Sequence, residues 1–419
     1  MSPTTHFPYR HGRLHCEGVS LATLADAVGT PAYVYSKAAL LESYAAYDAA
    51  FKDVPHVICY AIKANSNLGV ISTLAKAGAG ADIVSGGELQ RALRAGVAAR
   101  KIIFSGVGKT REEMREALKA DILMFNVESL SELRALDEVA RELGTRAPVA
   151  LRVNPDVDPQ THKYISTGLK TSKFGIPYTQ ALAAYEEAAK LAGIEVVGAQ
   201  MHIGSQLTKS APFADATARL AALVKTLRER RIRISLVDLG GGLGIRYRDE
   251  TPPSHAEYAT VVLPALRELN ATVVLEPGRS IVGNAGALLT RVLYRKTTEA
   301  KQFVVVDAAM NDLIRPAFYD AYHEILPVAE PRSGAVRETV DVVGPICESG
   351  DFFAKDRTIA QAAEGDLLAV MSAGAYGFVM ASNYNTRPRP VEVLVDGDRY
   401  TIVRRRETFE DLVAGETTV

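Results

Sequence analysis

The sequence predicts an α/β protein, a (β/α)8 barrel joined to a mainly β domain. Between about residues 32 and 276 a short apolar run is repeatedly followed by an amphipathic helical stretch, which indicates a parallel sheet. Eight such repeats match the count and the length of a closed barrel. After Arg279 the alternation stops, and a chain of 419 residues exceeds the size that one hydrophobic core usually serves. We therefore expect two domains.

The eight predicted barrel strands are rich in β-branched residues and end in polar or glycine residues. They are HVICYAIKAN (56–65), ADIVS (81–85), KIIFSG (101–106), DILMFNV (121–127), VALRVN (149–154), VVGAQMHIGS (196–205), ISLVDLGGG (234–242) and TVVLEPG (272–278).

Seven segments between these strands have the apolar spacing of amphipathic helices. They are NLGVISTLAKAG, GELQRALRAG, TREEMREALKA, ESLSELRALDEVARELG, TQALAAYEEAAKLAG, the stretch from Pro212 to Arg231, and SHAEYATVVLPALREL. An open, doubly wound sheet is the alternative that this alternation leaves.

The mainly β domain is predicted from short apolar runs separated by turn residues, with no long helix between them. These runs are KQFVVVDAAM, TVDVVGPICESGD, DLLAVMSAGAYGF and RPVEVLVDGDRYTIVRR. The first thirty residues do not fit the barrel repeat. We therefore expect a barrel over residues 32–276 and a second domain built from 1–31 and 277–419, in which 327–338 forms a surface loop.

Composition limits the classes of function. Hydrophobic residues make up 47% of the chain and charged residues 23%, and the formal net charge is −1, so the basic face of a nucleic-acid-binding protein is not expected. Cys16, Cys59 and Cys347 form no C-x-x-C pair, which fits a reducing cytoplasm. The amino-terminal residues lack the apolar stretch of a signal peptide, and no apolar run is long enough for a membrane span. We expect a soluble, cytoplasmic protein.

Chemically unusual residues gather where the predicted strands end. These are Lys63, Asp82, Arg152, His202, Gly240–Gly242 and Glu276. Barrel enzymes build their active sites at the carboxyl ends of the strands, whereas the positions below are packed with branched side chains. The sequence therefore predicts an active site at this rim.

Lys63 follows an apolar strand and is followed by small residues. A lysine that is partly desolvated there can lose its proton near neutral pH and form a Schiff base with an aldehyde. A lysine whose ammonium group extends to the surface is the alternative.

The glycines of DLGGGLGI offer consecutive N–H groups for a phosphate. They do not form a dinucleotide fingerprint, because the third glycine of that pattern would fall on Ile245. Glu276 of EPGR can keep a pyridine nitrogen protonated, and Pro277 and Gly278 turn the chain tightly after it. Plain turns are the alternative in both places.

His202 in QMHIGSQ has apolar residues on one side and glycine and serine on the other. A lone histidine in this setting is more often a core residue than a catalyst. It has no partners at metal-binding spacing, so we expect no zinc or iron site.

Taken together, the segments YAIKAN, LRVNP, SKFGI, MHIGSQ, DLGGGLG, EPGR, CESGD and GAYGF resemble the fold-type III pyridoxal-phosphate decarboxylases. The resemblance runs from about Ala32 to Val395. It implies an alanine-racemase-like barrel that carries pyridoxal phosphate and a β domain that completes the site. HKYISTGLKTSKFGI, CESGD and NYNTRPRPVEVLV resemble the diaminopimelate decarboxylase branch in particular.

The resemblance implies a role for each matching residue. For the cofactor it implies Lys63 as the Schiff-base lysine, His202 stacked on the ring and Glu276 at the ring nitrogen. The implied phosphate contacts are Ser205, Gly241, Gly242 and Gly278, aided by Tyr376. Arg279 is implied as a further cofactor contact, and Asp82, Glu88 and Arg152 as second-rank contacts.

For the substrate, the resemblance implies that Arg279, Arg315 and Tyr319 bind a distal carboxylate, with Tyr376 nearby, and that Glu348 meets a distal ammonium. Cys347 resembles the family's proton donor, presented by the partner subunit of a homodimer. A thiol suits this role as a general acid. The alternative is that Cys347 is a small buried apolar residue, as most free cysteines are.

The expected reaction is therefore decarboxylation of meso-2,6-diaminopimelate to L-lysine and CO2, with no metal. Arginine binds carboxylates bidentately, and meso-diaminopimelate keeps a distal carboxylate that ornithine lacks. A decarboxylase of ornithine, arginine or carboxynorspermidine would share the barrel. An alanine-racemase-like enzyme would need an opposing tyrosine base and commonly an arginine at the ring nitrogen, which Glu276 opposes. A non-catalytic regulatory homologue is the alternative from another class.

Overall fold

The computed structural model describes residues 5–157 and 173–419. Contacts divide the chain into two compact units. The barrel unit comprises Leu41–Ile245 and Glu250–Ser280, and the mixed-sheet unit comprises Met1–Leu40, Arg246–Asp249 and Ile281–Val419.

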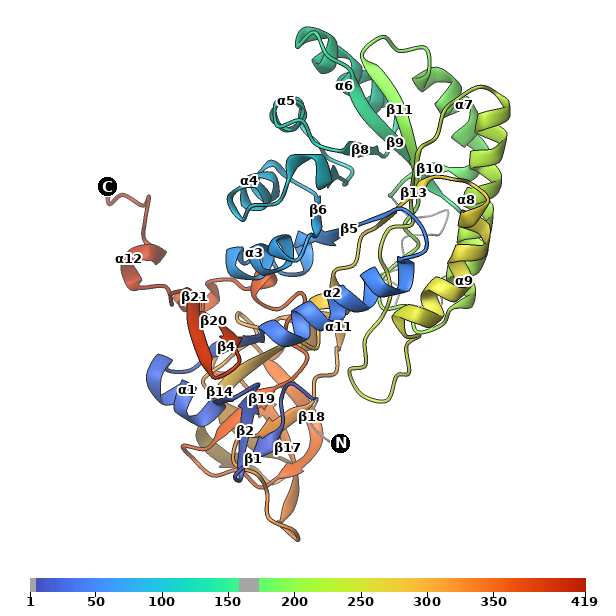
Figure 1. Cartoon of the computed structure of the whole chain (residues 1–419). Coiled ribbons are helices and arrows are strands. Elements are labelled where there is room, and N and C mark those ends of the chain that lie inside the picture. Colours follow the sequence, from blue (N-terminus) through green and yellow to red (C-terminus); the bar gives the residue numbers. More distant parts are fainter. Residues whose placement is uncertain (1–4, 158–172) are drawn as a thin grey trace. The chain divides into compact units, whose positions relative to one another are not determined.

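Eight parallel strands close into a barrel within the described residues of the barrel unit (Figure 1). In spatial order they are β5 (His56–Ala61), β6 (Gly80–Ile83), β7 (Ile102–Phe104), β8 (Met124–Val127), β9 (Ala147–Asn154), β11 (Ile194–Gln200), β12 (Leu236–Asp238) and β13 (Thr272–Leu275). The pairing of β13 with β5, in which Leu275 lies opposite Ile58, closes the ring. All eight predicted strands are confirmed, and the closed ring excludes the open sheet.

Small and medium-sized apolar side chains fill part of the barrel interior. One cluster is made of Cys59, Ile103, Met124, Ala150 and Val274. Each comes from a different strand, and each is fully buried. Packing of this kind leaves no channel, so chemistry is confined to the strand ends.

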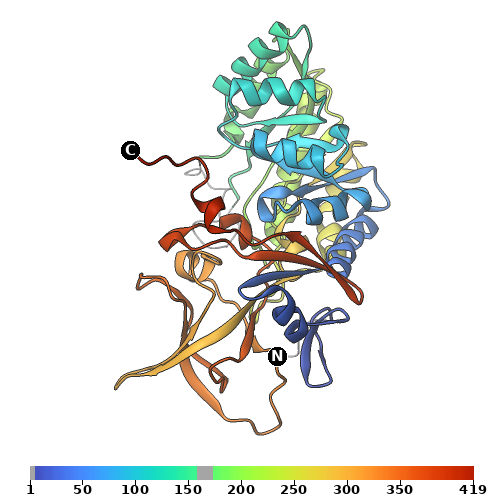
Figure 2. The same cartoon turned by 90° about the vertical axis from the view of Figure 1, so that its left-hand side faces the viewer.

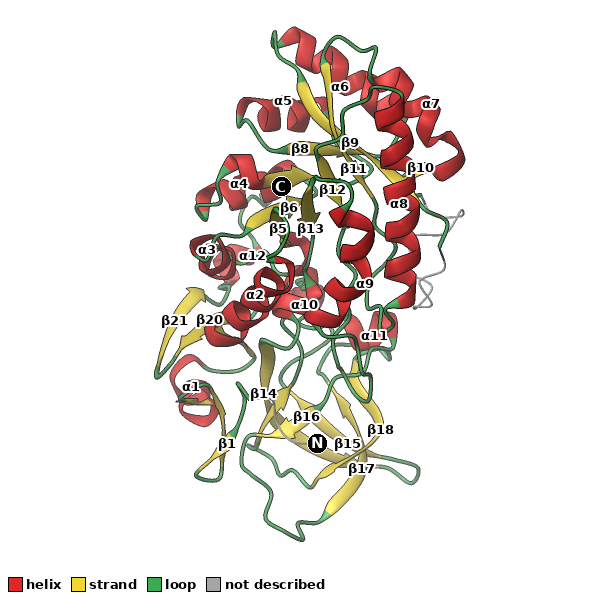
Figure 3. Cartoon of the chain, turned by 45° about the vertical axis from the view of Figure 1, so that its right-hand side comes forward, coloured by secondary structure: helices red, strands yellow, loops and turns green. Residues whose placement is uncertain are grey.

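Helices lie outside the strands of the barrel unit (Figure 3). They are α3 (Leu68–Lys76), α4 (Gly86–Arg94), α5 (Arg111–Lys119), α6 (Leu130–Glu142), α7 (Tyr178–Ala188), α8 (Ala211–Glu229) and α9 (His255–Arg267), with η1 (Ile62–Ala64) and η2 (Ala99–Lys101) in the connections. Ser85, Thr110, Ser129 and Ser254 each accept a hydrogen bond from a backbone N–H in the first turn of the helix that follows. All seven expected helices are present.

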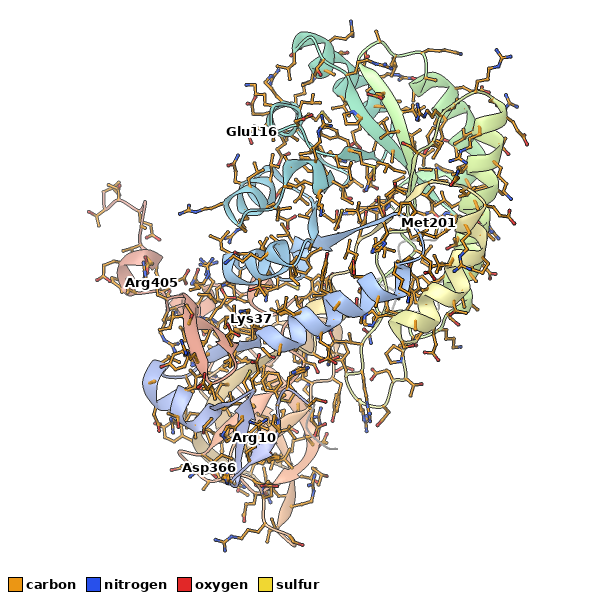
Figure 4. The ribbon with its side chains drawn as sticks, in the orientation of Figure 1. Arg10, Lys37, Glu116, Met201, Asp366 and Arg405 are labelled. Atoms are coloured by element: carbon orange, nitrogen blue, oxygen red, sulfur yellow. The ribbon has the colours of Figure 1, made fainter. Side chains whose placement is uncertain are left out.

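Three elements near the barrel were not expected from the sequence. The α2 helix (Lys37–Phe51), whose amino end is labelled at Lys37 in Figure 4, precedes the first barrel strand. Its alanine-rich sequence favours a helix, but no barrel strand stands before it to mark the alternation. The strand β10 (Ile176–Pro177) pairs with β9, and α10 (Arg279–Val282) follows β13.

The mixed-sheet unit contains two sheets. A nine-stranded sheet has the order β18-β17-β15-β14-β4-β20-β21, with β16 and β19 joined to it through β14, and a small sheet has the order β1-β2-β3. Figure 2 shows the hairpin of β20 and β21 in red. The strands are β1 (Tyr9–Arg10), β2 (Arg13–Cys16), β3 (Val19–Ser20), β4 (Ala32–Ser36), β14 (Gly286–Thr297), β15 (Gln302–Val306), β16 (Ile325–Pro327), β17 (Arg337–Val343), β18 (Phe352–Ala360), β19 (Leu367–Val370), β20 (Val391–Asp396) and β21 (Arg399–Arg404).

Helices in the mixed-sheet unit are short, as the sequence predicts. They are α1 (Leu21–Val28), α11 (Arg315–Tyr319), α12 (Phe409–Leu412), η4 (Phe378–Met380) and η5 (Tyr384–Thr386). Buried residues of α1, β2, β4, β14 and β20 share one hydrophobic core. The surface loop expected at 327–338 is shorter in the structure: residues 329–336 are exposed, but Pro327 ends β16 and Arg337 begins β17.

The barrel unit begins at Leu41 and ends at Ser280 rather than at the expected residues 32 and 276, and Arg246–Asp249 belong to the mixed-sheet unit. The strand β4 pairs with β14 and β20 in the mixed sheet, so the unit extends past residue 31. Along the part of the chain that the structure describes, no helix has both the length and the apolar character needed to cross a membrane.

Candidate active site

Lys63 lies in η1, directly beyond the carboxyl end of β5. The loop that follows is held by the Tyr60 hydroxyl, which donates to the carbonyl of Asn65 at 2.9 Å, and by the Asn67 N–H, which donates to Asn65 Oδ1 at 3.0 Å. Lys63 Nζ is 2.5 Å from Oδ2 of Asp82, a fully buried side chain on β6. The carboxylate favours the charged ammonium, so the neutral lysine expected from apolar surroundings is not the form that this contact supports.

Asp82 and Glu88 form an acidic pair of residues on the Lys63 side of the rim. The Oδ1 atom of Asp82 is buried without a hydrogen-bond partner among the described residues. Glu88 accepts a hydrogen bond from the Val84 N–H at 2.7 Å, and burial raises its pKa to about 7. The positive charge of Lys63 partly offsets this rise in the Glu88 pKa, whereas the negative charge of Asp82 adds to it.

Arg152 of β9 is held in place from two sides. Its Nη1 is 2.9 Å from Oε1 of Glu128, and its guanidinium lies over the ring of Phe174 at 4.7 Å. Glu128 also accepts hydrogen bonds from the N–H groups of Gly106 and Gly175. This buried ion pair therefore ties together the loops after β7 and β9, and its positive charge acts on His202.

Glu276 follows β13 directly and belongs to a buried polar network. The Asn126 side-chain amide lies 3.1 Å from each of three acceptors: Glu276 Oε1, Asp238 Oδ2 and Ser105 Oγ. Gln200 donates to Glu276 Oε1 at 3.2 Å. Desolvation is the largest cause that raises the pKa of Glu276 well above its usual value, followed by the charge of Asp238. Two facing buried carboxyls cannot both ionise easily, so the pair holds a proton in common.

His202 lies two residues beyond β11, next to Met201, which is labelled in Figure 4. Desolvation, assisted by the positive charges of Arg152 and Lys63, lowers the pKa of His202 well below its usual value. The Gly241 N–H donates to His202 Nδ1 at 3.1 Å, so this nitrogen carries no proton and the remaining proton is on Nε2. His202 is therefore neutral.

The glycine segment after β12 needs glycine for two reasons. Gly240 and Gly242 have φ angles of +68° and +112°, which side chains rarely adopt. A Cβ on Gly241 would lie 2.3 Å from the carbonyl oxygen of Glu276. The glycine segment therefore packs directly against the EPGR segment, and the Glu276 N–H donates to the carbonyl of Gly240 at 2.9 Å.

Arg279 and Ser205 stand together at the same end of the barrel. The buried Arg279 guanidinium donates from Nη2 to Ser205 Oγ at 3.1 Å. Gly278 packs against η1, since a Cβ there would meet Ala64 at 3.0 Å and Ala61 at 3.1 Å. The structure thus brings together the sequence-predicted barrel residues, from Lys63 through His202 and Ser205 to Gly278 and Arg279.

The remaining predicted residues belong to the mixed-sheet unit. Cys347 is exposed rather than buried as a small hydrophobe, and its N–H donates to Asn385 Oδ1 at 2.8 Å. The neighbouring Glu348 is exposed as well. Asp351 caps this loop by accepting hydrogen bonds from the N–H groups of Ile346 and Met310, both at 2.7 Å. The thiol is therefore accessible on a fixed loop.

Arg315 and Tyr319 are the first and last residues of α11. Arg315 is buried, and Tyr319 packs edge-on against Phe318. Tyr376 lies in GAYGF with a φ of +55°. A Cβ on Gly374 of this segment would lie 1.8 Å from the carbonyl oxygen of Val282, so the backbones approach as closely as glycine allows.

Sequence reasoning missed Asn126, Gln200 and Asp238. Each is a polar residue that lies within or at the end of a strand and directly follows a buried apolar residue. A buried polar residue in such a strand requires partners, and that was the available signal.

Comparisons with known proteins identify the chemistry of this rim. A family model described as the pyridoxal binding domain of pyridoxal-dependent decarboxylases matches residues 37–283. Over 411 residues the chain is 58% identical to a diaminopimelate decarboxylase of Pseudomonas aeruginosa, with 98% of each chain covered. The chain belongs to the diaminopimelate decarboxylase family. Members of this family are pyridoxal-dependent, and pyridoxal phosphate is the cofactor.

Solved structures of the family have the same fold. A diaminopimelate decarboxylase of M. jannaschii in complex with L-lysine is 41% identical, with a TM-score of 0.95, and covers 100% of this chain and 99% of its own. A Helicobacter pylori diaminopimelate decarboxylase complexed with L-lysine is 43% identical, with a TM-score of 0.90, and covers 94% and 98%. The resemblance drawn from the sequence is confirmed. Residues 162–172 of its HKYISTGLKTSKFGI segment lie outside the described residues.

The residues of the barrel rim fit this cofactor. Side chains at Gly240–Gly242 and Gly278 would clash with neighbouring atoms, so the backbone of these segments is not covered by side chains of its own. Gln200 Oε1 and Asp82 Oδ1 are buried polar atoms that have no partner within the described parts of the chain. A lysine, a neutral imidazole and a buried carboxyl complete the set of groups that a charged pyridine aldehyde requires.

Proposed function

We propose that the protein converts meso-2,6-diaminopimelate to L-lysine and CO2, with pyridoxal phosphate held by Lys63. The observation that carries the proposal is the meeting of Lys63, His202 and Glu276 at one end of a closed barrel, in a chain of this family. Barrel enzymes place their reacting groups at this end. The 58% identity to a diaminopimelate decarboxylase over nearly the whole chain favours this reaction over decarboxylation of ornithine, arginine or carboxynorspermidine.

Pyridoxal phosphate, when bound, supplies an aldehyde for the substrate amine and a ring that accepts the electron pair left by the departing CO2. The chain has to hold a proton at the ring nitrogen, and Glu276 is suited to this. Its raised pKa means that the buried carboxyl carries a proton, which it would share with the ring nitrogen. The ionised carboxylate is then paired with a cation instead of lying unpaired in a buried site.

His202 would lie against the face of the ring. Because the imidazole is neutral, it adds no positive charge beside a protonated ring. Asp82 keeps the charge on the Lys63 nitrogen by its 2.5 Å contact. We assign the phosphate to Ser205, Gly241, Gly242 and Gly278, aided by Tyr376. Arg279 is assigned a further cofactor contact, and Asp82, Glu88 and Arg152 are assigned supporting contacts.

On the substrate side, Arg279, Arg315 and Tyr319 would bind the distal carboxylate and Glu348 the distal ammonium, with Tyr376 close by. Cys347 would donate a proton to the carbon that has lost CO2. An exposed thiol on a fixed loop can reach a substrate presented to it, whereas the buried Cys16 and Cys59 cannot.

We further propose a two-fold homodimer in which Cys347 and Glu348 of one subunit complete the site of the other. Support comes from the sequence resemblance and from the exposure of both residues in the mixed-sheet unit. The three free thiols also suit a reducing compartment, so we expect the enzyme to work in the cytoplasm.

The proposed reaction has a direct test in product analysis. Purified protein incubated with pyridoxal phosphate and meso-diaminopimelate should release L-lysine and CO2 in equal amounts. Release of CO2 from ornithine, arginine or lysine should be much slower, because these substrates offer no distal carboxylate to an arginine. Equal or faster decarboxylation of any of the three would contradict the assignment.

A further inference from the structure

Arg315 lies in a buried cluster that the proposed function does not explain. Its Nη1 is 2.8 Å from Nε2 of His323, a fully buried histidine that follows α11. Its guanidinium also lies over the ring of Tyr247 at 4.6 Å. The Tyr247 ring in turn packs edge-on against His323, with ring centroids 5.5 Å apart. All three residues belong to the mixed-sheet unit.

The protonation state of His323 follows from its partners. A guanidinium has only donors, so the contact with Arg315 requires a lone pair on Nε2. The proton of the ring is therefore on Nδ1, which donates to the carbonyl oxygen of Met371 at 2.8 Å. The Met371 N–H is itself bound to the carbonyl of Glu324 at 2.8 Å. His323 is thus a neutral acceptor whose ring is fixed at both nitrogens.

A neutral acceptor has a particular consequence for an arginine that binds an anion. A carboxylate in the place of His323 would orient Arg315 equally well, but it would cancel the charge that attracts a substrate carboxylate. The neutral imidazole fixes one edge of the Arg315 guanidinium but does not neutralise the positive charge of Arg315. The Tyr247 ring covers a face of the guanidinium without contributing a full negative charge.

We propose that His323 and Tyr247 are positioning residues that hold Arg315 in the orientation required for a distal carboxylate, and that they thereby set the preference for dicarboxylate substrates. The proposal rests on the role that the proposed function gives to Arg315. It predicts that disturbing either residue weakens recognition of the distal carboxylate more than it slows the chemical step.

Two substitutions at His323 separate its two hydrogen bonds. Glutamine at His323 (His323→Gln) can place an amide oxygen near the position of Nε2 and so keep an acceptor for Arg315. Asparagine (His323→Asn) can place an amide nitrogen near Nδ1, which keeps the donor to Met371 but leaves no acceptor within reach of Arg315. In the holoenzyme we expect His323→Asn to raise the KM for meso-diaminopimelate about tenfold or more, with kcat changed by less than about threefold. His323→Gln should restore most of the loss.

Binding without turnover provides a second readout. Pimelate, a seven-carbon dicarboxylate without amines, should compete with the substrate better than hexanoate, a monocarboxylate. His323→Asn should abolish most of this difference and His323→Gln should keep it. Bound-cofactor absorbance and the thermal unfolding midpoint report whether each variant is folded and loaded.

Tyr247 gives an independent pair of variants if the His323 variants do not fold. Tyr247→Phe keeps an aromatic face for Arg315, and Tyr247→Leu removes it. The leucine variant should lose the preference for pimelate over hexanoate, and the phenylalanine variant should not.

The possible failures are distinguishable. If the wild-type enzyme shows no preference for pimelate and does not favour meso-diaminopimelate over ornithine, the proposed function of Arg315 fails. If the wild type shows both preferences and folded His323→Asn and Tyr247→Leu retain them, or lose kcat at unchanged KM, the positioning role is refuted.

Discussion

Homodimers of Lys63→Ala and of Cys347→Ala should each lose nearly all decarboxylase activity, at least about a thousandfold, because one lacks the proposed cofactor amine and the other the proposed proton donor. When the two variants are mixed and exchange subunits, activity should recover to roughly a quarter of the wild-type level. Random exchange makes half of the dimers mixed, and one of the two sites in each mixed dimer carries neither defect.

A matched control uses two variants of the barrel unit. Lys63 and Glu276 both belong to this unit, so every site in a mixed dimer of Lys63→Ala and Glu276→Ala has one defect. This mixture should stay inactive under the same exchange conditions. Confirmed exchange, for example with differently tagged subunits, without recovery in the Lys63→Ala and Cys347→Ala mixture would place each site within one chain.

The second large effect is expected at Arg315. Arg315→Ala should lower kcat/KM for meso-diaminopimelate by a factor that corresponds to a loss of about 2–5 kcal/mol of transition-state stabilisation. The reason is that a desolvated, charge-assisted contact with the substrate would be lost. The side chain is buried, so no solvent can replace it fully. Arg399→Ala is the control, since that side chain is 89% exposed in the same unit. Unchanged activity of Arg315→Ala would show that another group binds the distal carboxylate.

The barrel was predictable because its signals are local. Each strand is an apolar run that ends in a polar or glycine residue, and helices such as α5 and α9 begin at a Thr or Ser that caps them. The α2 helix was not predicted because no barrel strand precedes it, so it does not belong to the strand–helix alternation that marked the other helices. The extent of the mixed-sheet unit depends on the pairing of β4 with β14, about 250 residues away in the chain, and no local pattern records that pairing.

The site was predictable where a residue type is unusual at a strand end, as for Lys63, His202 and Glu276. The residues that set the protonation states of these three side chains could not be predicted from the sequence. Asn126 becomes meaningful only when the ends of β8, β12 and β13 meet and bring Asp238 and Glu276 to its amide. His323 likewise explains Arg315 only through the fold of the chain after α11. The protonation state and the orientation of a site residue depend on contacts with residues that are distant in the sequence. Sequence patterns indicate only which residues belong to the site and at which strand ends they lie.

Lys63 is proposed to carry pyridoxal phosphate, and the proposed roles of the other site residues are all defined relative to its nitrogen. Borohydride reduction of the holoenzyme, followed by proteolysis and mass spectrometry, tests it most directly. The yellow colour of the enzyme should disappear, and the cofactor should be found covalently bound to the peptide that contains Lys63. Lys109 is an internal control, because its fully buried ammonium is paired with Glu132 at 2.7 Å and should remain unmodified. Recovery of the label on any lysine other than Lys63 would show that Lys63 does not carry the cofactor.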